Sequence, residues 1–193
     1  MHSTLLEQLN RIARLDENEI ELIKKSFRPK TLAKGDFFLE SGGINKHVGY
    51  LRKGLVRYFV DKDGEESTFE FTKEGEFIAD YQSFSLKAPS IQNIQAIESC
   101  EVLTITYDDL QVIFNTTKHG NLIGRLIVEH RFDIMVNQLL AVYMQNHEER
   151  YQSFIKNYSG LNQRIPQYLV ASYVGVKPES LSRIRKRITK GIS

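Results

Sequence analysis

The stretch "ASYVGVKPESLSRIRKRI" (residues 171–188) combines apolar residues, a glycine, a proline and a dense set of basic side chains. Just before it, Pro166 predicts the start of a helix. Gly175 predicts the turn that ends this helix, because a residue without Cβ adopts positive φ at no steric cost. Pro178 then predicts the start of a second helix. The stretch therefore predicts two short helices joined by a tight turn.

The two predicted helices have apolar sides that can pack together. The inner face of the first consists of Leu169, Val170, Tyr173 and Val174. Four positions have the spacing of a helix-turn-helix motif, with a small residue at the helix crossing, a turn glycine and two apolar anchors: Ala171, Gly175, Leu181 and Ile184. The opposite face of the second helix is charged, which indicates a surface that stays outside the core.

The charge of this region favours nucleic acid as the partner. Residues 161–193 hold seven Lys and Arg residues against one acid, whereas the whole chain has a net charge of only +2. A basic amphipathic helix alone is also typical of a solvated chain end, but the anchor spacing favours double-stranded DNA. In the major groove Arg reads guanine, Glu accepts from cytosine, and lysines contact phosphates. The candidate DNA-binding residues are Glu179, Ser180, Arg183, Lys186, Arg187 and Lys190.

The N-terminal two thirds of the chain read as helices followed by short strands. Leu5 and Leu9 recur at helical spacing, and Asp16 with Glu19 forms a potential capping box for a second helix. From about Thr31 the pattern changes to short β-type runs with glycine turns roughly every ten residues, as in a β-barrel or β-roll.

Residues 121–146 predict a long helix with a wide apolar surface and no proline. A small roll cannot cover so long a helix, so the pattern predicts that it packs against the same helix of a second subunit. Packing within one chain is the alternative. A further amphipathic helix follows through Tyr151 and Phe154 and ends before Gly160, which places a module boundary near residue 147.

Several classes of protein are disfavoured. Cys100 is the only cysteine, so neither an internal disulfide nor a cysteine-cluster metal site can form. No apolar run reaches the length of a membrane span, and the N-terminal sequence is charged too early for a secretory signal, so we expect a soluble cytoplasmic protein without a membrane partner. No phosphate loop, dinucleotide fingerprint or Ser–His–Asp grouping is visible, so no enzyme activity is expected.

Taken together, these segments resemble the Crp/Fnr family of bacterial transcription regulators. The resemblance rests on "LAKGDFFLESGG", "GYLRKGLVRYF", "KDGEE" and "EGEFIADYQSF", and on "HEERYQSFIKNYSGLNQRIPQYLVASYVGVKPESLSRIRKRI". It implies an α+β fold with an N-terminal cyclic-nucleotide-binding-like β-roll (a double-stranded β-helix), a long dimerisation helix and a C-terminal winged helix-turn-helix. The implied domains are an effector roll (1–118), the dimerisation helix (119–147) and the DNA-binding domain (148–193).

The resemblance also implies roles for individual residues of the second helix. Base-reading positions of the family fall on Glu179 and Arg183. The family member that senses cyclic AMP has an arginine where this chain has Pro178. Because proline cannot make the contact of an arginine, this departure predicts a different DNA site. A homodimer that also meets RNA polymerase is the expected assembly.

The roll departs from the nucleotide-binding pattern in its effector pocket. Five positions correspond to that pocket: Ala79, Asp80, Tyr81, Ser90 and Ile91. Family members that bind cyclic nucleotides have an Arg-Ser pair at the last two, so the arginine that holds the phosphate is missing. Asp80 is interpreted as a ribose ligand or, more simply, as a helix cap or surface residue. We therefore expect no cyclic AMP binding and no cofactor; the effector, if the roll has one, is unknown.

Two alternatives stay open at this level. A β-roll also occurs in metal-bearing cupin enzymes, but the five histidines (His2, His47, His119, His130 and His147) lack the paired spacing of cupin ligands, so no metal site is expected. An axial histidine of a haem sensor is a narrower form of the same alternative. The second alternative is a small-ligand-binding regulatory module that acts on a protein partner and has a non-functional DNA-binding end.

Overall fold

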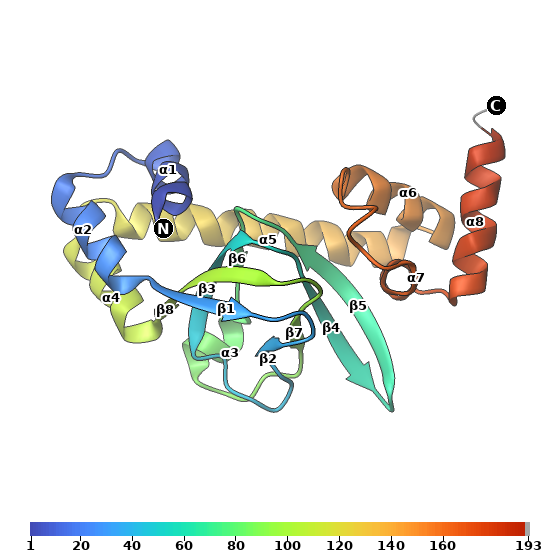
Figure 1. Cartoon of the computed structure of the whole chain (residues 1–193), viewed down its shortest axis with the longest axis horizontal. Helices are drawn as coiled ribbons and strands as arrows, with labels where there is room; N and C mark the ends of the chain where they lie inside the picture. The colour runs from blue at the N-terminus through green and yellow to red at the C-terminus, as the bar shows by residue number, and fades with distance from the viewer. Residues whose placement is uncertain (192–193) are drawn as a thin grey trace. The chain divides into compact units, whose positions relative to one another are not determined.

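The computed structural model describes residues 1–191 (Figure 1). Its helices are α1 (Ser3–Ile12), α2 (Glu17–Ser26), α3 (Tyr81–Leu86), α4 (Tyr107–Thr116), α5 (Gly120–Met144), α6 (His147–Asn157), α7 (Gln167–Val174) and α8 (Pro178–Gly191). Its strands are β1 (Arg28–Leu32), β2 (Phe37–Leu39), β3 (His47–Lys53), β4 (Val56–Lys62), β5 (Glu65–Thr72), β6 (Phe77–Ile78), β7 (Asn93–Ala96) and β8 (Cys100–Thr106). The predicted α+β class is confirmed.

The chain forms two compact units. The first consists of Met1–Val60 and Phe71–Arg131, and the second of Asp61–Glu70 and Phe132–Ser193. The end of the β4–β5 hairpin thus belongs to the same unit as the C-terminal helices, and helix α5 contributes to both units. The three domain ranges expected from the sequence stay a prediction.

The strands form two four-stranded sheets that make up the roll. Their orders are β1-β8-β3-β6 and β2-β7-β4-β5. Strand β8 lies between β1 and β3 and pairs antiparallel with both. Its residues Val102, Leu103 and Ile105 are almost fully buried, as expected for a central strand rich in β-branched and apolar side chains.

Helices α1, α2 and α4 and the start of α5 lie at one end of the roll (Figure 1), where an apolar cluster joins them to it. Leu5 and Leu9 of α1, which were expected to form a helix face, are buried against Tyr50 of β3 and Leu103 of β8. Ile123, from the first turn of α5, joins the same cluster. Burying an aliphatic side chain stabilises a fold by about 1.5–3 kcal/mol, so this cluster attaches the N-terminal helices and the start of α5 to the roll.

A tight turn between β3 and β4 packs against the chain's only cysteine. The Cys100 thiol is buried at the start of β8, with Sγ 3.2 Å from the carbonyl oxygen of Glu98. Gly54 lies opposite with a φ of +104°, and a Cβ on it would approach Cys100 Sγ to 2.5 Å. Only glycine fits here, because both the backbone conformation and the space exclude a side chain.

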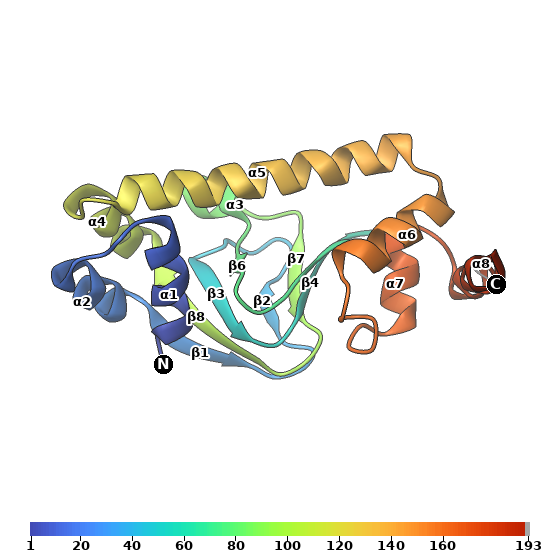
Figure 2. The ribbon, with the colours of Figure 1, turned by 90° about the horizontal axis from the view of Figure 1, so that it is seen from above.

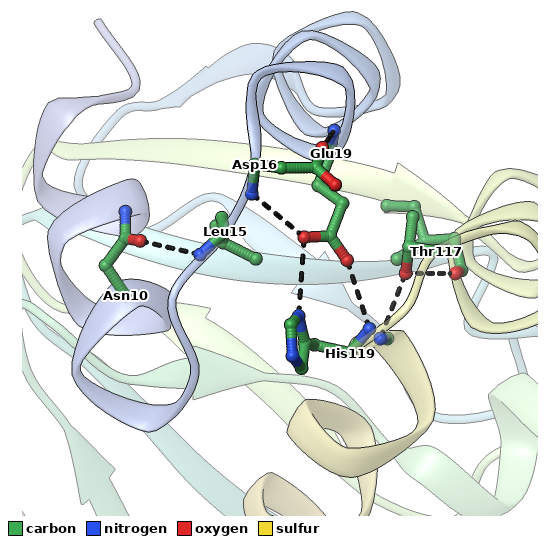
Figure 3. Close-up of polar contacts among 8 residues, drawn as sticks. Asn10, Leu15, Asp16, Glu19, Thr117 and His119 are labelled. Atoms are coloured by element: carbon green, nitrogen blue, oxygen red, sulfur yellow. Dashed lines mark hydrogen bonds and ion pairs between the residues drawn. The ribbon is translucent and has the colours of Figure 1, made fainter.

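A buried carboxylate connects α2 to the beginning of α5 (Figure 3). Glu19 is 4% exposed and completes the predicted capping box with Asp16. Its Oε1 accepts from the backbone N–H of His119 at 3.0 Å, and Oε2 lies 3.4 Å from His119 Nδ1. Burial raises the pKa of Glu19, but hydrogen bonds from the backbone N–H groups of Asp16 and His119 and from the His119 ring outweigh it, so the pKa lies below its ordinary value.

The C-terminal part of the second unit is helical (Figure 2). Helix α6 begins with a capping box in which the Asn146 side chain accepts from the N–H groups of Glu148 and Glu149. Turns, not strands, connect α6 to α7. The winged form of the helix-turn-helix is not confirmed, since within residues 1–191 no strand follows Thr106.

Candidate functional site

The turn between α7 and α8 has the geometry expected from its glycine. Gly175 adopts a φ of +82°, and its N–H donates to the carbonyl oxygens of Ala171 and Ser172. The next N–H, of Val176, also donates to Ala171 O, at 2.9 Å. These bonds satisfy carbonyls in the last turn of α7 and end the helix at Val174, and α8 begins at Pro178.

Apolar packing fixes the two helices against each other. The predicted anchors Ala171, Leu181 and Ile184 are all 5% exposed or less. Leu169, Val170 and Val174 of α7 are buried with them. The faces of α8 are therefore fixed as the sequence predicted, with the apolar stripe inside and the charged face outside.

The candidate DNA-binding residues of α8 fall into four groups. Glu179, Arg183 and Lys186 are exposed, and Ser180 is partly buried near the turn. Arg187 is exposed but lies 3.1 Å from a carboxylate oxygen of Glu148 on α6, a pair that solvent screens and that adds little stability. The position of Lys190 is helical, and its side chain lies outside the described part of the chain.

Three side chains that sequence reasoning missed support the helix pair. Arg150 of α6 donates through Nη2 to the carbonyl oxygen of Tyr173 at 2.8 Å, and His147 Nδ1 lies 3.2 Å from that of Val174. Both side chains thus meet the C-terminal carbonyls of α7, where the positive charge of Arg150 is favourable. On α8, Arg185 donates to Gln167 Oε1 at 2.6 Å. The basic character of these residues was visible in the sequence, but their partners were not.

In the roll, Asp80 and Ser90, two of the predicted effector-pocket residues, are brought together. Both side chains are buried, and the Ser90 hydroxyl donates to Asp80 Oδ2 at 2.7 Å. Asp80 Oδ1 accepts from the N–H of Ser83 at 3.1 Å and caps α3. The helix-capping interpretation of Asp80 is therefore the one that the geometry supports, because both carboxylate oxygens have partners within the chain.

The backbone N–H of Ala79, next to Asp80, also has a hydrogen-bond partner within the chain. Tyr58 of β4 is 2% exposed, and its hydroxyl oxygen accepts from the N–H of Ala79 at 3.0 Å. Sequence reasoning did not place Tyr58 in this site, although a large aromatic residue in the middle of "LVRYFV" was a possible signal. The other two predicted pocket residues do not join the buried group: Tyr81 is 48% exposed and Ile91 is 80% exposed.

The remaining titratable residues offer no metal centre. Within residues 1–191, no group of three or more His, Cys, Asp or Glu side chains is arranged to hold a metal ion. His119 is engaged with Glu19, and His130 is exposed on α5. Nor does the described chain contain a helix whose length and apolar character would let it cross a membrane.

Comparisons with known proteins agree with this architecture. Residues 29–117 match the family model of the cyclic nucleotide-binding domain. The c-di-GMP responsive global regulator CLP of Xanthomonas campestris is similar over 91% of this chain and 93% of its own, with a TM-score of 0.73 and 17% identity. The fold is that of the Crp/Fnr regulators.

Two further solved structures extend the Crp/Fnr resemblance. FixK2 from Bradyrhizobium japonicum has a TM-score of 0.72 at 15% identity, covering 86% of both chains. A Crp/Fnr-family transcriptional regulator from Eubacterium rectale has a TM-score of 0.70 at 15% identity, covering 92% of this chain and 85% of its own. None of the curated proteins matches the chain. The resemblance to the Crp/Fnr regulators inferred from the sequence is thus confirmed at the level of the fold, and no catalytic family is indicated.

Proposed function

We propose that the protein is a homodimeric, sequence-specific DNA-binding transcription regulator of the Crp/Fnr type. The observation that carries the proposal is the α7–α8 pair, in which buried anchors orient α8 so that Glu179, Arg183 and Lys186 are exposed on one helix. An exposed helix of this kind fits the major groove of B-DNA. In this role the protein is cytoplasmic, its ligand is double-stranded DNA, and RNA polymerase is its further partner.

Each exposed side chain has a distinct task in this proposal. The Arg183 guanidinium donates two hydrogen bonds to guanine O6 and N7, and the Glu179 carboxylate accepts from cytosine N4. Lys186 contacts phosphate, which adds affinity that depends on salt but not on sequence. Arg187 reaches phosphate only by leaving Glu148, its partner on α6. Lys190 is proposed as a phosphate contact on its sequence position alone.

The exposed apolar side chains of α5 support the homodimer. Val128, Phe132, Met135, Leu139 and Val142 follow one another at spacings of four, three, four and three residues, and each is at least 44% exposed. This alternation is the heptad spacing of helices that pair along an apolar seam. When two copies of α5 pair, these large exposed apolar side chains are removed from water.

The roll, in this proposal, does not bind cyclic AMP or cyclic GMP. The groups that would meet a nucleotide are already hydrogen-bonded within the chain, namely the Asp80 carboxylate, the Ala79 N–H and the Ser90 hydroxyl. Ser90 stands where an arginine would hold the phosphate, so a bound phosphate would lose water without gaining a cation. Calorimetric titration should show no binding tighter than about 100 µM, whereas a Kd of about 10 µM or below would contradict this part of the proposal.

Selection of bound DNA from a random pool tests the central proposal. We expect a two-fold-symmetric motif whose half-sites lie about 10 base pairs apart, because two recognition helices of a dimer reach successive major grooves. The same motif should be recovered without any added nucleotide. Failure of the purified protein to enrich any sequence, at low salt and micromolar concentration, would rule out sequence-specific DNA binding.

A further inference from the structure

One hydroxyl group connects the hairpin to the first helix of the α7–α8 pair. Ser172 of α7 accepts through Oγ from the backbone N–H of Thr68 at 2.9 Å and donates to the carbonyl oxygen of Glu66, also at 2.9 Å. Thr68 Oγ1 lies 3.2 Å from Ser172 Oγ. A serine hydroxyl has one donor and two acceptor positions, so Ser172 uses its donor position on Glu66 and one acceptor position on the Thr68 N–H.

The position of β5 explains what this hydroxyl replaces. Strand β5 stands at the end of its sheet order, after β4. The outer edge of such a strand presents N–H and C=O groups that a neighbouring strand would otherwise pair. Ser172 meets an N–H and a C=O two residues apart on one strand, which is how a residue of an adjacent parallel strand would bond. A side chain of α7 thus takes the place of a ninth strand.

The contact between Ser172 and β5 lies where β5 becomes buried. Thr68 is 3% exposed and Glu70 is 4% exposed, whereas the hairpin residues from Asp61 to Ser67 are all exposed. The Glu70 carboxylate is close enough to Tyr173 to add to the effect of burial, and together they raise the pKa of the Tyr173 hydroxyl despite its bond to Tyr158 and the Arg150 charge. Burial in β5 thus begins at Thr68, the residue whose backbone N–H Ser172 accepts from, and continues to Thr72.

We propose that Ser172 is a positioning residue, which fastens the α7–α8 pair to β5 and so holds α8 in the orientation needed for DNA. This inference rests on the proposed DNA-binding function for its consequence, but not for the contact itself. In a dimer that reads two half-sites, loosely held recognition helices must be ordered on binding, and that ordering lowers affinity. The hydroxyl does not touch DNA in this proposal; it acts through the placement of α8.

Amide hydrogen exchange tests the contact without reference to DNA. In Ser172→Ala, the Thr68 amide should exchange about tenfold faster, because it loses its hydrogen-bond acceptor. In Ser172→Thr, which keeps the hydroxyl, the rate should stay within about threefold of the unaltered protein. Ser153→Ala removes a serine hydroxyl from α6, where it bonds to Gln145 Oε1 at 3.2 Å, and serves as the matched control. Unchanged Thr68 exchange in Ser172→Ala would overturn the proposal.

Binding to the selected DNA then tests the consequence. Ser172→Ala should lower affinity for the two-half-site DNA about tenfold, while Ser172→Thr and Ser153→Ala should change it less than about threefold. Faster Thr68 exchange with unchanged affinity would show that the contact exists but does not position α8, which also overturns the proposal. If the unaltered protein binds no DNA, the proposed function fails, and the exchange experiment still decides whether Ser172 holds the hairpin.

Discussion

The nucleotide-pocket position of the roll and the outer face of α8 use polar side chains in opposite ways. In the roll, the Asp80 carboxylate and Ser90 hydroxyl are buried and bonded to each other. On α8, Glu179 and Arg183 are exposed at the surface of a helix whose other side is packed. A buried polar group needs its partner within the fold, whereas an exposed one exchanges water for a ligand at small cost. The difference indicates which surface is available for recognition.

The largest effect is expected from placing charges on the exposed apolar seam of α5, which is the proposed dimer contact. Phe132→Glu together with Leu139→Glu places like charges along the proposed seam, so the protein should become monomeric. The loss of two-site attachment should weaken binding to the selected DNA by about a hundredfold or more. Analytical ultracentrifugation and DNA titration measure the two effects. His130→Glu with Asn137→Glu adds as many charges at exposed positions off this seam and should leave the dimer intact; equal behaviour of the two variants would contradict the seam.

On α8, two substitutions distinguish base reading from phosphate contact. Arg183→Ala should cost about 1–3 kcal/mol on the selected DNA and relax the choice of base at one position of each half-site. Lys186→Ala should instead weaken all sequences alike and make the salt dependence of binding shallower. Competition titrations at several salt concentrations separate these outcomes. Equal losses on selected and random DNA for Arg183→Ala would show that Arg183 does not read a base.

In the roll, removing the Tyr58 hydroxyl should remove the hydrogen bond that it accepts from the backbone N–H of Ala79. Tyr58→Phe leaves the N–H of Ala79 without its acceptor, at an expected cost of about 1–2 kcal/mol in the free energy of unfolding. Tyr168 is 61% exposed, so Tyr168→Phe is the matched control and should change the free energy by less than about 0.5 kcal/mol. Urea unfolding followed by circular dichroism measures both. A neutral Tyr58→Phe would mean that the hydroxyl contributes nothing to closing the pocket.

The smallest effect concerns Glu19 and depends on pH. The pKa of Glu19 is lowered in the folded protein, so its ionised form stabilises the fold above the unfolded pKa, and this stabilisation is lost as the pH falls through the folded pKa. Glu19→Gln should therefore cost about 1 kcal/mol at neutral pH and progressively less in acid. The exposed Glu21 provides the control, Glu21→Gln. The free energy of unfolding of each protein is measured at pH 7 and in mild acid. If Glu19 played no such role, the difference between the unaltered protein and Glu19→Gln would be the same at both pH values.

What the sequence could predict was local. The Asp16–Glu19 capping box, the Gly175 turn and the two faces of α8 each depend on residues within a few positions of one another, and all three are present. Backbone geometry alone relates such residues, so their spacing is informative. The long α5 was predictable for the same reason.

What the sequence could not predict depends on distant segments. The contact between Ser172 and Thr68 joins positions 104 residues apart, and nothing in either stretch marks the other as its partner. Tyr58 reaches Ala79 in the same way, across 21 residues. The expected wing came from the family resemblance and not from a strand-like pattern in the C-terminal residues, and within residues 1–191 no strand follows Thr106. Patterns of one stretch indicate which face is buried, but not what buries it.

The reactivity of the buried thiol at the start of β8 can be used to measure local opening of the roll. A thiol reagent modifies the accessible thiolate, and Cys100 is 1% exposed beneath the Gly54 turn. Because the chain has no other cysteine, the rate at which an added disulfide reagent releases its coloured product measures how often this turn separates from β8. A molecule that binds and tightens the roll would slow that colour change, so a simple absorbance assay can screen compounds of any chemical class for an effector.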